Sequence, residues 1–260
     1  MAETIRIEAD DRGIATLSLA RPQKHNAMSA QMIGELAEDA KALAGDAAVR
    51  VIVLTGDGPT FCAGGDLGWM KDQMAADAQT RRDGATTIAN MLRSWNEMPK
   101  PVNARLQGNA FGGGLGLASV ADVAIAVDSA QFGLTETRLG LIPATIGPYV
   151  VARMGEARAR RVFFSSRRFD AVEATALGLI ARAVPAADLD IAVEAEVAPY
   201  LACAPGAIAA AKALTRRLGP RIDDAVIADS IDALIAQWEG DEAAEGIAAF
   251  FEKRPPTWAN

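Results

Sequence analysis

Cysteine and histidine, the residues of disulfide frameworks and zinc sites, are scarce in this chain. Its 260 residues include two cysteines and one histidine. Because Cys62 and Cys203 lie far apart in the sequence, they indicate neither a disulfide framework nor a zinc site, and a reducing compartment is the simpler interpretation. His25 has no second histidine and no nearby acidic cluster with which to share a metal ion. We therefore expect no metal site.

The chain also lacks an excess of positive charge and any long apolar run. Its formal net charge is -7, which argues against a nucleic-acid-binding protein and requires any polyanionic ligand to find a local basic pocket. No apolar run approaches the ~18 residues of a membrane span. The first residues, MAETIRIEADD, lack the charged-then-apolar pattern of a signal peptide. We predict a cytoplasmic protein that binds neither nucleic acid nor a membrane.

Short apolar runs that alternate with helical stretches indicate an α/β core with right-handed crossovers. An N-terminal hairpin with its turn at residues 10–13 is followed by a helix that Ser29 caps. Runs rich in Val and Ile suit buried parallel strands. These predicted strands are residues 49–56, 101–108 and 122–127. One of the intervening helices is expected around residues 86–95.

The chain becomes mostly alanine-rich and helical after about residue 147. The predicted helices are residues 187–202, 207–218, 222–238 and 242–252, and residues 179–184 are a candidate strand. We divide the chain into an α/β core with the active site, residues 1–195, and a C-terminal helical segment, residues 196–260. The apolar faces of these helices can be buried against a partner subunit or against the core of the same chain, and both alternatives remain open.

Two glycine-rich loops follow predicted strands, where open α/β sheets bind ligands. They are residues 55–67 and 107–118, and the second contains Gly112-Gly113-Gly114 at the expected start of a helix. Unpaired N–H groups and the positive end of the helix dipole meet at such a position. No Lys-Ser/Thr pair follows as in a P-loop, and the dinucleotide fingerprint is incomplete. One N–H from each loop would make an oxyanion hole.

Four blocks in this order resemble the enoyl-CoA hydratase/isomerase (crotonase) family. They are RPQKHNAMS at 21–29, FCAGGDL at 61–67, KPVNARLQGNAFGGGLGLA at 100–118 and FGLTETRLGLIP at 132–143. The resemblance implies a superhelix of stacked ββα units with a C-terminal helical trimerisation region. It also implies a homotrimer or a dimer of trimers, an acyl-CoA thioester as substrate, and no cofactor, since coenzyme A is part of the substrate.

The resemblance assigns the N–H groups of Gly65 and Gly113 to the thioester oxygen and the acid/base role to Glu136. A carboxylate in a partly apolar pocket has a raised pKa, which suits proton transfer. Hydratases of the family usually carry another glutamate two residues after the triple glycine, and here that position is Gly116. This departure puts the reaction type in question.

We predict the hydration of a 2-enoyl-CoA. Residues 136–155 resemble the bacterial methylglutaconyl-CoA hydratase-like branch, so 3-methylglutaconyl-CoA is a candidate substrate. Its free carboxylate would need a cation, and the candidates are Arg82, Arg105 and Arg138. A Δ3,Δ2-enoyl-CoA isomerase that uses Glu136 alone and a non-catalytic acyl-CoA-binding protein remain as alternatives. A thioesterase or dehalogenase would need a carboxylate nucleophile that we cannot identify.

The same resemblance suggests two groups of ligand-binding residues. The candidates for binding coenzyme A are Lys24, His25, Ala27, Ala63, Asp66, Leu67 and Lys253. The candidates for the acyl pocket are Trp69, Met70, Phe111 and Pro143. Asp66 is also expected to order its own loop by accepting backbone N–H groups. We interpret Cys62 as a packing residue and not as a nucleophile.

Overall fold

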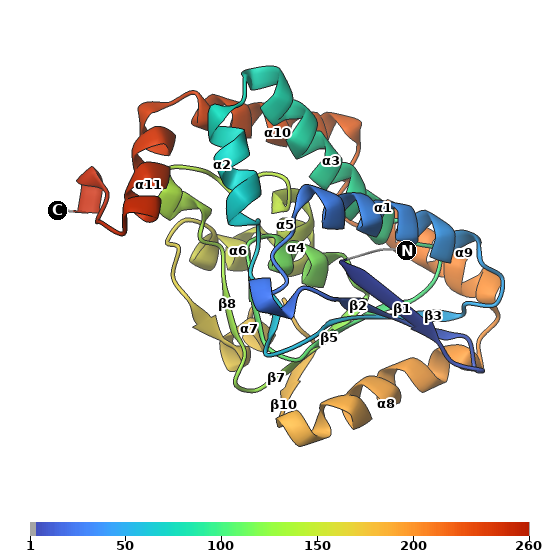
Figure 1. Ribbon diagram of the computed structural model, residues 1–260. Coiled ribbons are helices and arrows are strands. Elements are labelled where there is room, and N and C mark those ends of the chain that lie inside the picture. Colours follow the sequence, from blue (N-terminus) through green and yellow to red (C-terminus); the bar gives the residue numbers. More distant parts are fainter. Residues whose placement is uncertain (1–3, 260) are drawn as a thin grey trace.

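Two sheets lie at the centre of the computed structural model, which describes residues 4–259 (Figure 1). Residues 1–3 and 260, the extreme ends of the two predicted segments, lie outside the described residues. The larger sheet has the order β1-β2-β3-β5-β7-β10 and the smaller one the order β4-β6-β8-β9. From β3 to β8, consecutive strands therefore alternate between the sheets, and a helix follows each pair, which is the expected stacking of ββα units.

The strands of the larger sheet are β1 Ile5–Ala9, β2 Ile14–Leu19, β3 Val51–Gly56, β5 Val102–Leu106, β7 Val123–Val127 and β10 Arg182–Val184. Those of the smaller sheet are β4 Thr60–Cys62, β6 Asn109–Phe111, β8 Gln131–Gly133 and β9 Phe169–Asp170. The β1/β2 hairpin and the β8/β9 pair are antiparallel, while the other pairs are parallel. All residues of β3 are buried, as expected for a strand covered on both faces.

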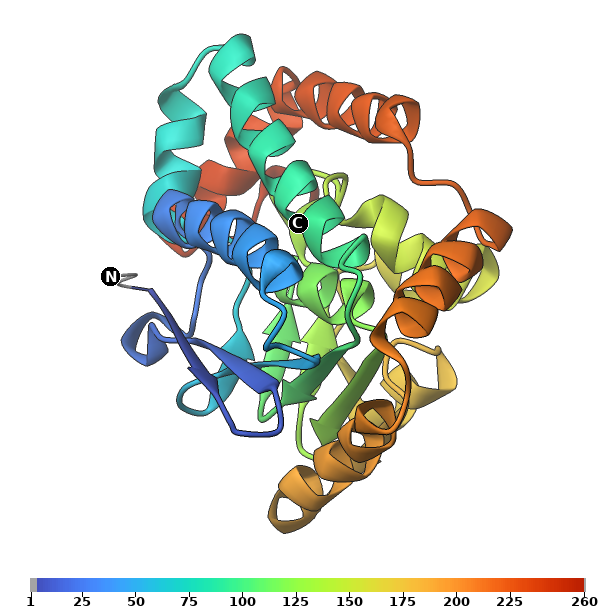
Figure 2. The ribbon, with the colours of Figure 1, turned by 90° about the vertical axis from the view of Figure 1, so that its right-hand side faces the viewer.

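The helices cover both faces of the larger sheet, and α8 lies on the opposite side from α1 and α3 (Figure 2). They are α1 Ala30–Gly45, α2 Leu67–Ala75, α3 Ala78–Asn96, α4 Gly113–Val120, α5 Gly147–Met154, α6 Glu156–Phe163, α7 Ala171–Ala176, α8 Leu189–Leu201, α9 Pro205–Leu218, α10 Asp224–Trp238 and α11 Asp241–Glu252. Short 3₁₀ helices are η1 Pro22–Lys24, η2 Glu136–Leu139, η3 Ala186–Asp188 and η4 Thr257–Ala259.

Side-chain caps explain where several helices begin. The Ser29 hydroxyl accepts the Met32 N–H at the start of α1, as predicted, and the Asp66 and Asp77 carboxylates cap α2 and α3 in the same way. The two aspartates are important for the site, because they fix the start of α2, which follows the first glycine loop, and the start of α3, which follows α2.

The C-terminal helices differ in what covers their apolar faces. On α10, Ile227, Ile231 and Ile235 pack against alanines of α3, so this face is buried within the chain. Helix α11 packs against η2 so closely that a Cβ at Gly246 would lie 2.5 Å from the Leu139 carbonyl carbon. By contrast, α9 has no buried residue. The boundary predicted at residues 195/196 falls inside α8, and an oligomerisation role for the C-terminal segment stays a prediction.

Within residues 4–259, no single helix has both the length and the apolar character needed to cross a membrane. One pair of helical segments, Ala186–Leu201 and Pro205–Leu218, has this length and apolar character only when the two are taken together, and they are bent by 109° relative to each other.

Candidate active site

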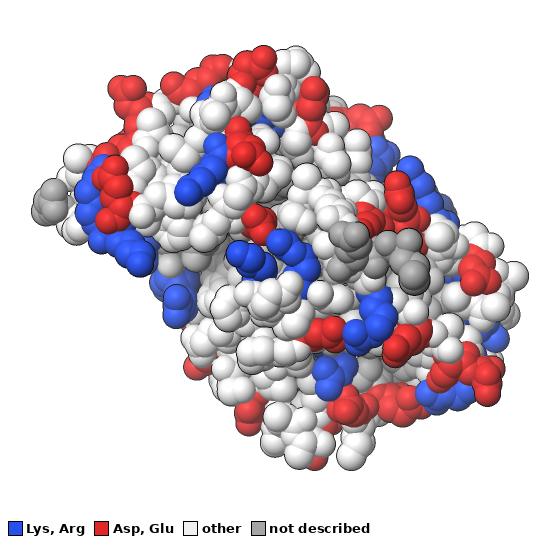
Figure 3. All heavy atoms as spheres, viewed as in Figure 1, with Lys and Arg blue, Asp and Glu red and all other residues white. Residues whose placement is uncertain are grey.

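A cavity of about 630 Å³ lies between the two glycine loops, α2, η2 and the C-terminal helices α10 and α11. Its walls are mostly apolar, with polar groups at a few places. Lys and Arg side chains border the region where the helical part meets the sheets (Figure 3). Three arginines line the cavity on the η2 side, Arg138, Arg167 and Arg168. Arg167 pairs with Glu173 (2.7 Å), so Arg138 and Arg168 are the arginines of this group that give an acidic chain local positive charge at the site.

Gly65 and Gly113 both line the cavity, one from each glycine loop. Met28 bridges the first loop, because its N–H donates to the Gly64 carbonyl (2.8 Å) and its carbonyl accepts the Asp66 N–H (3.0 Å). This parallel bridge leaves the N–H of Gly65 out of the backbone pairing. Neither Gly65 nor Gly113 donates a backbone hydrogen bond within residues 4–259.

The conformation of the second loop depends on Gly112, whose backbone φ of +47° is one that residues with a side chain rarely adopt. The Gly112 N–H donates to the Gly133 carbonyl (3.0 Å), which fixes the loop to β8. Gly113 then becomes the first residue of α4, where N–H groups have no intrahelical acceptor and the helix dipole is positive. The arrangement can stabilise negative charge on an oxygen atom.

Glu136 begins η2 and lines the same cavity. Its Oε2 is buried and has no hydrogen-bond partner in the described part of the chain. Burial raises the pKa of this carboxyl from 4.5 to about 7, and the backbone N–H groups of Glu136 and Thr135 only partly oppose this effect. A carboxyl that titrates near neutral pH can both accept and donate a proton during a reaction.

Gly116, the position of the missing glutamate, is buried in α4 and faces Ile146. A Cβ at residue 116 would lie 2.6 Å from Ile146 Cγ2, so the isoleucine fills the space that a side chain would need. Ile146 itself lines the cavity. The wall of the site at this point is therefore apolar, and nothing in the sequence around Gly116 indicated that Ile146 would form it.

The predicted ligand-binding residues divide into two groups. All four candidates for the acyl pocket line the cavity, together with two candidates for coenzyme A binding, Ala63 and Leu67. The other candidates, Lys24, His25, Ala27, Asp66 and Lys253, are not among its lining residues. Their role in binding coenzyme A stays a prediction.

Several residues of the first glycine loop and the segment before it make contacts within the chain. His25 Nδ1 lies 3.1 Å from Thr60 Oγ1. Asp66 accepts the Gly68 N–H (2.8 Å) and pairs with Arg21 (3.0 Å), so it orders its own loop as expected. Cys62 is buried, and burial raises the pKa of its thiol to about 12, which leaves no thiolate for nucleophilic chemistry.

The three arginines proposed to bind a substrate carboxylate differ in whether they line the cavity. Arg82 pairs with Asp232, and Arg105 pairs with Asp190 (2.7 Å), both away from the cavity. Only Arg138 of the three lines it. Sequence reasoning missed several polar residues of the lining. Two of them, Gln73 and Arg81, belong to a polar stretch with no motif of its own.

Comparison with known proteins agrees with this geometry. The family described as Enoyl-CoA hydratase/isomerase matches residues 9–260. The mitochondrial methylglutaconyl-CoA hydratase of Mus musculus is 31% identical over 270 residues, which cover 97% of this chain and 81% of that protein.

Solved structures agree as well. An enoyl-CoA hydratase from Mycobacterium avium is 31% identical, with a TM-score of 0.86, over 99% of this chain and 100% of that one. Pseudomonas aeruginosa AtuE is 40% identical, with a TM-score of 0.80, over 99% and 100% of the two chains. The fold is therefore that of the crotonases, and the chain belongs to the enoyl-CoA hydratase/isomerase family.

Proposed function

We propose that this enzyme adds water to the double bond of a 2-enoyl-CoA thioester, with Glu136 as the acid/base. The observation that carries the proposal is a buried carboxyl with a pKa near 7 in the same cavity as two glycines whose N–H groups have no acceptor among residues 4–259. The hydratase names of the relatives support the same reaction.

In the proposed reaction, the Glu136 carboxylate takes a proton from water as the water oxygen bonds to C3. The double-bond electrons move to C2 and the thioester, and negative charge develops on the thioester oxygen. The N–H groups of Gly65 and Gly113 stabilise that charge, and removing one such donor typically costs ~10²–10³ in rate. The protonated Glu136 then returns its proton to C2, so that one water is added in total.

Without a glutamate at Gly116, the water needs other partners. Thr135 and Thr145 line the cavity, and their hydroxyl groups are the polar groups that we propose for this task. The name of the mouse relative supports 3-methylglutaconyl-CoA as the candidate substrate. We propose that Arg138, which lines the same cavity as Glu136, binds the free carboxylate of this substrate.

The apolar contact between Gly116 and Ile146 favours a second candidate, a Δ3,Δ2-enoyl-CoA isomerase. In this reaction Glu136 would remove a proton from C2 and return it to C4, and no water would be required. The acid/base residue and the oxyanion donors are the same in both reactions, so product analysis must separate them.

The test is to incubate the purified protein with crotonyl-CoA, 3-methylglutaconyl-CoA and a 3-enoyl-CoA, each in parallel with the Glu136→Gln variant. The addition of one water to a 2-enoyl substrate, lost in the variant, supports the hydratase. A product of unchanged mass from the 3-enoyl substrate without hydration supports the isomerase. Binding of acyl-CoA without turnover would instead support a non-catalytic acyl-CoA-binding protein.

We also propose that the chain assembles as a homotrimer or a dimer of trimers and needs no cofactor. Helix α9 has no buried residue in the single chain, and Leu218 at its end is 79% exposed. A partner subunit would cover this surface. Sedimentation measurements on the purified protein would test the assembly.

A further inference from the structure

The cavity has a second polar end, formed by Gln73 on α2 and Arg81 on α3. The apolar side chains Ala85, Ile88, Leu234 and Trp238 line the same cavity, and Trp238 contacts Arg81. Gln73 and Arg81 belong to α2 and α3, whereas Glu136 belongs to η2 and the two glycine N–H groups belong to the glycine loops. The proposed reaction uses neither Gln73 nor Arg81, so their presence in an apolar wall needs another explanation.

Gln73 is nine-tenths buried, with 7% of its surface exposed, and its side-chain amide has no hydrogen-bond partner in residues 4–259. Gly84 on α3 provides the room for this amide, because a Cβ there would lie 3.2 Å from Gln73 Oε1. Neither atom of this amide is among the fully buried side-chain atoms without a partner in residues 4–259, so the amide is accessible from the cavity that it lines. The amide is therefore available to a ligand.

Arg81 has no carboxylate within ion-pair distance in the described chain. Its Nε donates to the Gln73 carbonyl (2.9 Å) and its Nη2 to the Met74 carbonyl (3.1 Å). Its guanidinium lies 5.2 Å from the centre of the Trp238 ring. Asp77, one turn earlier, uses its carboxylate to cap α3 through the Thr80 N–H (2.8 Å). The Nη1 group of Arg81 and part of Nη2 remain free to bind an anion.

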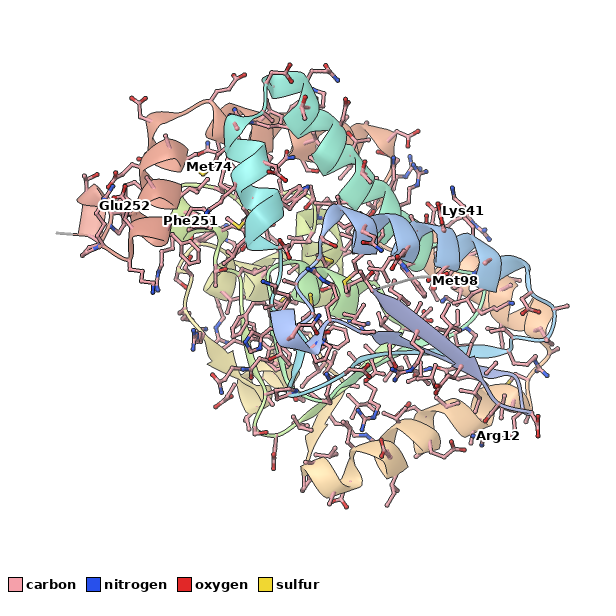
Figure 4. The ribbon with its side chains drawn as sticks, viewed as in Figure 1. Arg12, Lys41, Met74, Met98, Phe251 and Glu252 are labelled. Atoms are coloured by element: carbon pink, nitrogen blue, oxygen red, sulfur yellow. The ribbon has the colours of Figure 1, made fainter. Side chains whose placement is uncertain are left out.

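The surroundings of this end hold the two groups in position. Met74 on α2 and Phe251 on α11, both labelled in Figure 4, pack against the same hydrophobic cluster of Leu141, Ala243 and Ile247. Lys71 Nζ lies 4.8 Å from the centre of the Phe251 ring, which further fixes α2 against α11. Helix α2 therefore presents Gln73 to the cavity from a supported backbone.

The helix also sets the distance from the reaction centre. Gln73 follows Gly65 by eight residues, most of them in α2, and at 1.5 Å per helical residue the two are roughly 10 Å apart. Trp69 and Met70, which also line the cavity, lie between them on the wall. A four-carbon acyl group held at Gly65 would end well before Gln73, while a longer one would reach it.

We propose that Arg81 and Gln73 bind a carboxylate at the far end of the acyl chain, so that the enzyme selects acyl-CoA substrates with a tail longer than crotonyl and a terminal carboxylate. A carboxylate would accept from Arg81 Nη1 and from the Gln73 amide, and the Trp238 ring would exclude water beside it. This inference rests on the proposed function, because it places the thioester oxygen at Gly65 and Gly113.

The experiment measures binding of unreactive saturated thioesters by isothermal titration calorimetry. Adipoyl-CoA and hexanoyl-CoA, and then suberoyl-CoA and octanoyl-CoA, form pairs of equal length that differ in the terminal group. We expect the wild-type protein to bind the carboxylate member of at least one pair about 10- to 100-fold more tightly, as for charge-assisted hydrogen bonds. Arg81→Met should abolish this preference, and Arg82→Met, whose arginine pairs with Asp232 outside the cavity, should retain it.

A second variant covers the possibility that Arg81→Met loosens the end of α2. Gln73→Leu should lower the carboxylate preference and, because it replaces a polar amide in the cavity wall with an apolar side chain, tighten the binding of the methyl-terminated member. A wild-type protein without a carboxylate preference, or a preference that survives both substitutions, would overturn the inference. Hydration of crotonyl-CoA, which is too short to reach Arg81, reports separately on the proposed function.

Discussion

Replacing Glu136 with glutamine should make the protein more stable above neutral pH while it stops turnover. The pKa of this carboxyl is about 7 in the folded chain, against an ordinary value of 4.5. Between these two values the folded state binds more protons than the unfolded state, so the free energy of unfolding falls as pH rises. The loss is complete above about pH 7, where it amounts to roughly 3 kcal/mol.

Glutamine is isosteric and cannot ionise, so Glu136→Gln should remove this loss. Thermal melts followed by circular dichroism should show the variant melting roughly 6–12 °C above wild type at about pH 8. Near pH 4.5, where the wild-type carboxyl is protonated, the two proteins should melt together. Glu239→Gln, a change of an exposed glutamate, serves as the matched control and should follow the wild type throughout. Equal pH dependence in wild type and Glu136→Gln would refute the claim that burial destabilises the carboxylate.

Three further substitutions test the walls of the site. Gly116→Glu should lower the melting temperature, because its Cβ would lie 2.6 Å from Ile146 Cγ2 and overpacking typically costs 1–3 kcal/mol; the Gly116→Glu/Ile146→Gly pair should recover part of the loss. Gly113→Pro should lower kcat at least ~10²-fold relative to Gly113→Ala. Both side chains must displace Met28 Cε, which a Cβ would meet at 1.9 Å, but only proline lacks the N–H; equal kcat in the two variants would exclude this donor. Gly246→Val should lower both the melting temperature and turnover, because its Cβ would lie 2.5 Å from the Leu139 carbonyl carbon and would displace η2 and Glu136. Normal kinetics and stability in this variant would show that α11 does not support the site.

The parts of the site that depend on backbone and local motif could be predicted from the sequence. Short Val- and Ile-rich runs indicated β3, β5 and β7, and the triple glycine indicated the start of α4. The position of Glu136 followed from its block in the family resemblance, and its raised pKa followed from the expected apolar pocket. These features depend on a few neighbouring residues, so a single sequence contains them.

The parts that depend on contacts between distant segments could not be predicted. Nothing near Gly116 indicates that Ile146 fills the adjoining space, since the two residues meet only when α5 follows the loop after η2. Gln73 and Arg81 carry no motif, and their position at the end of the cavity depends on the turn between α2 and α3. The helix predicted around residues 86–95 begins earlier, at Ala78, because the Asp77 cap outweighs the polar composition of its first turns.

The most direct test of the central claim is to incubate wild-type and Glu136→Gln proteins with crotonyl-CoA in heavy-oxygen water and to locate the label by mass spectrometry. We expect heavy oxygen on C3 of the wild-type product, with the acyl-CoA otherwise intact, and no labelled product from the variant. Labelled product from Glu136→Gln at the wild-type rate would contradict the claim, because the buried carboxyl would then have no part in moving the proton of the attacking water.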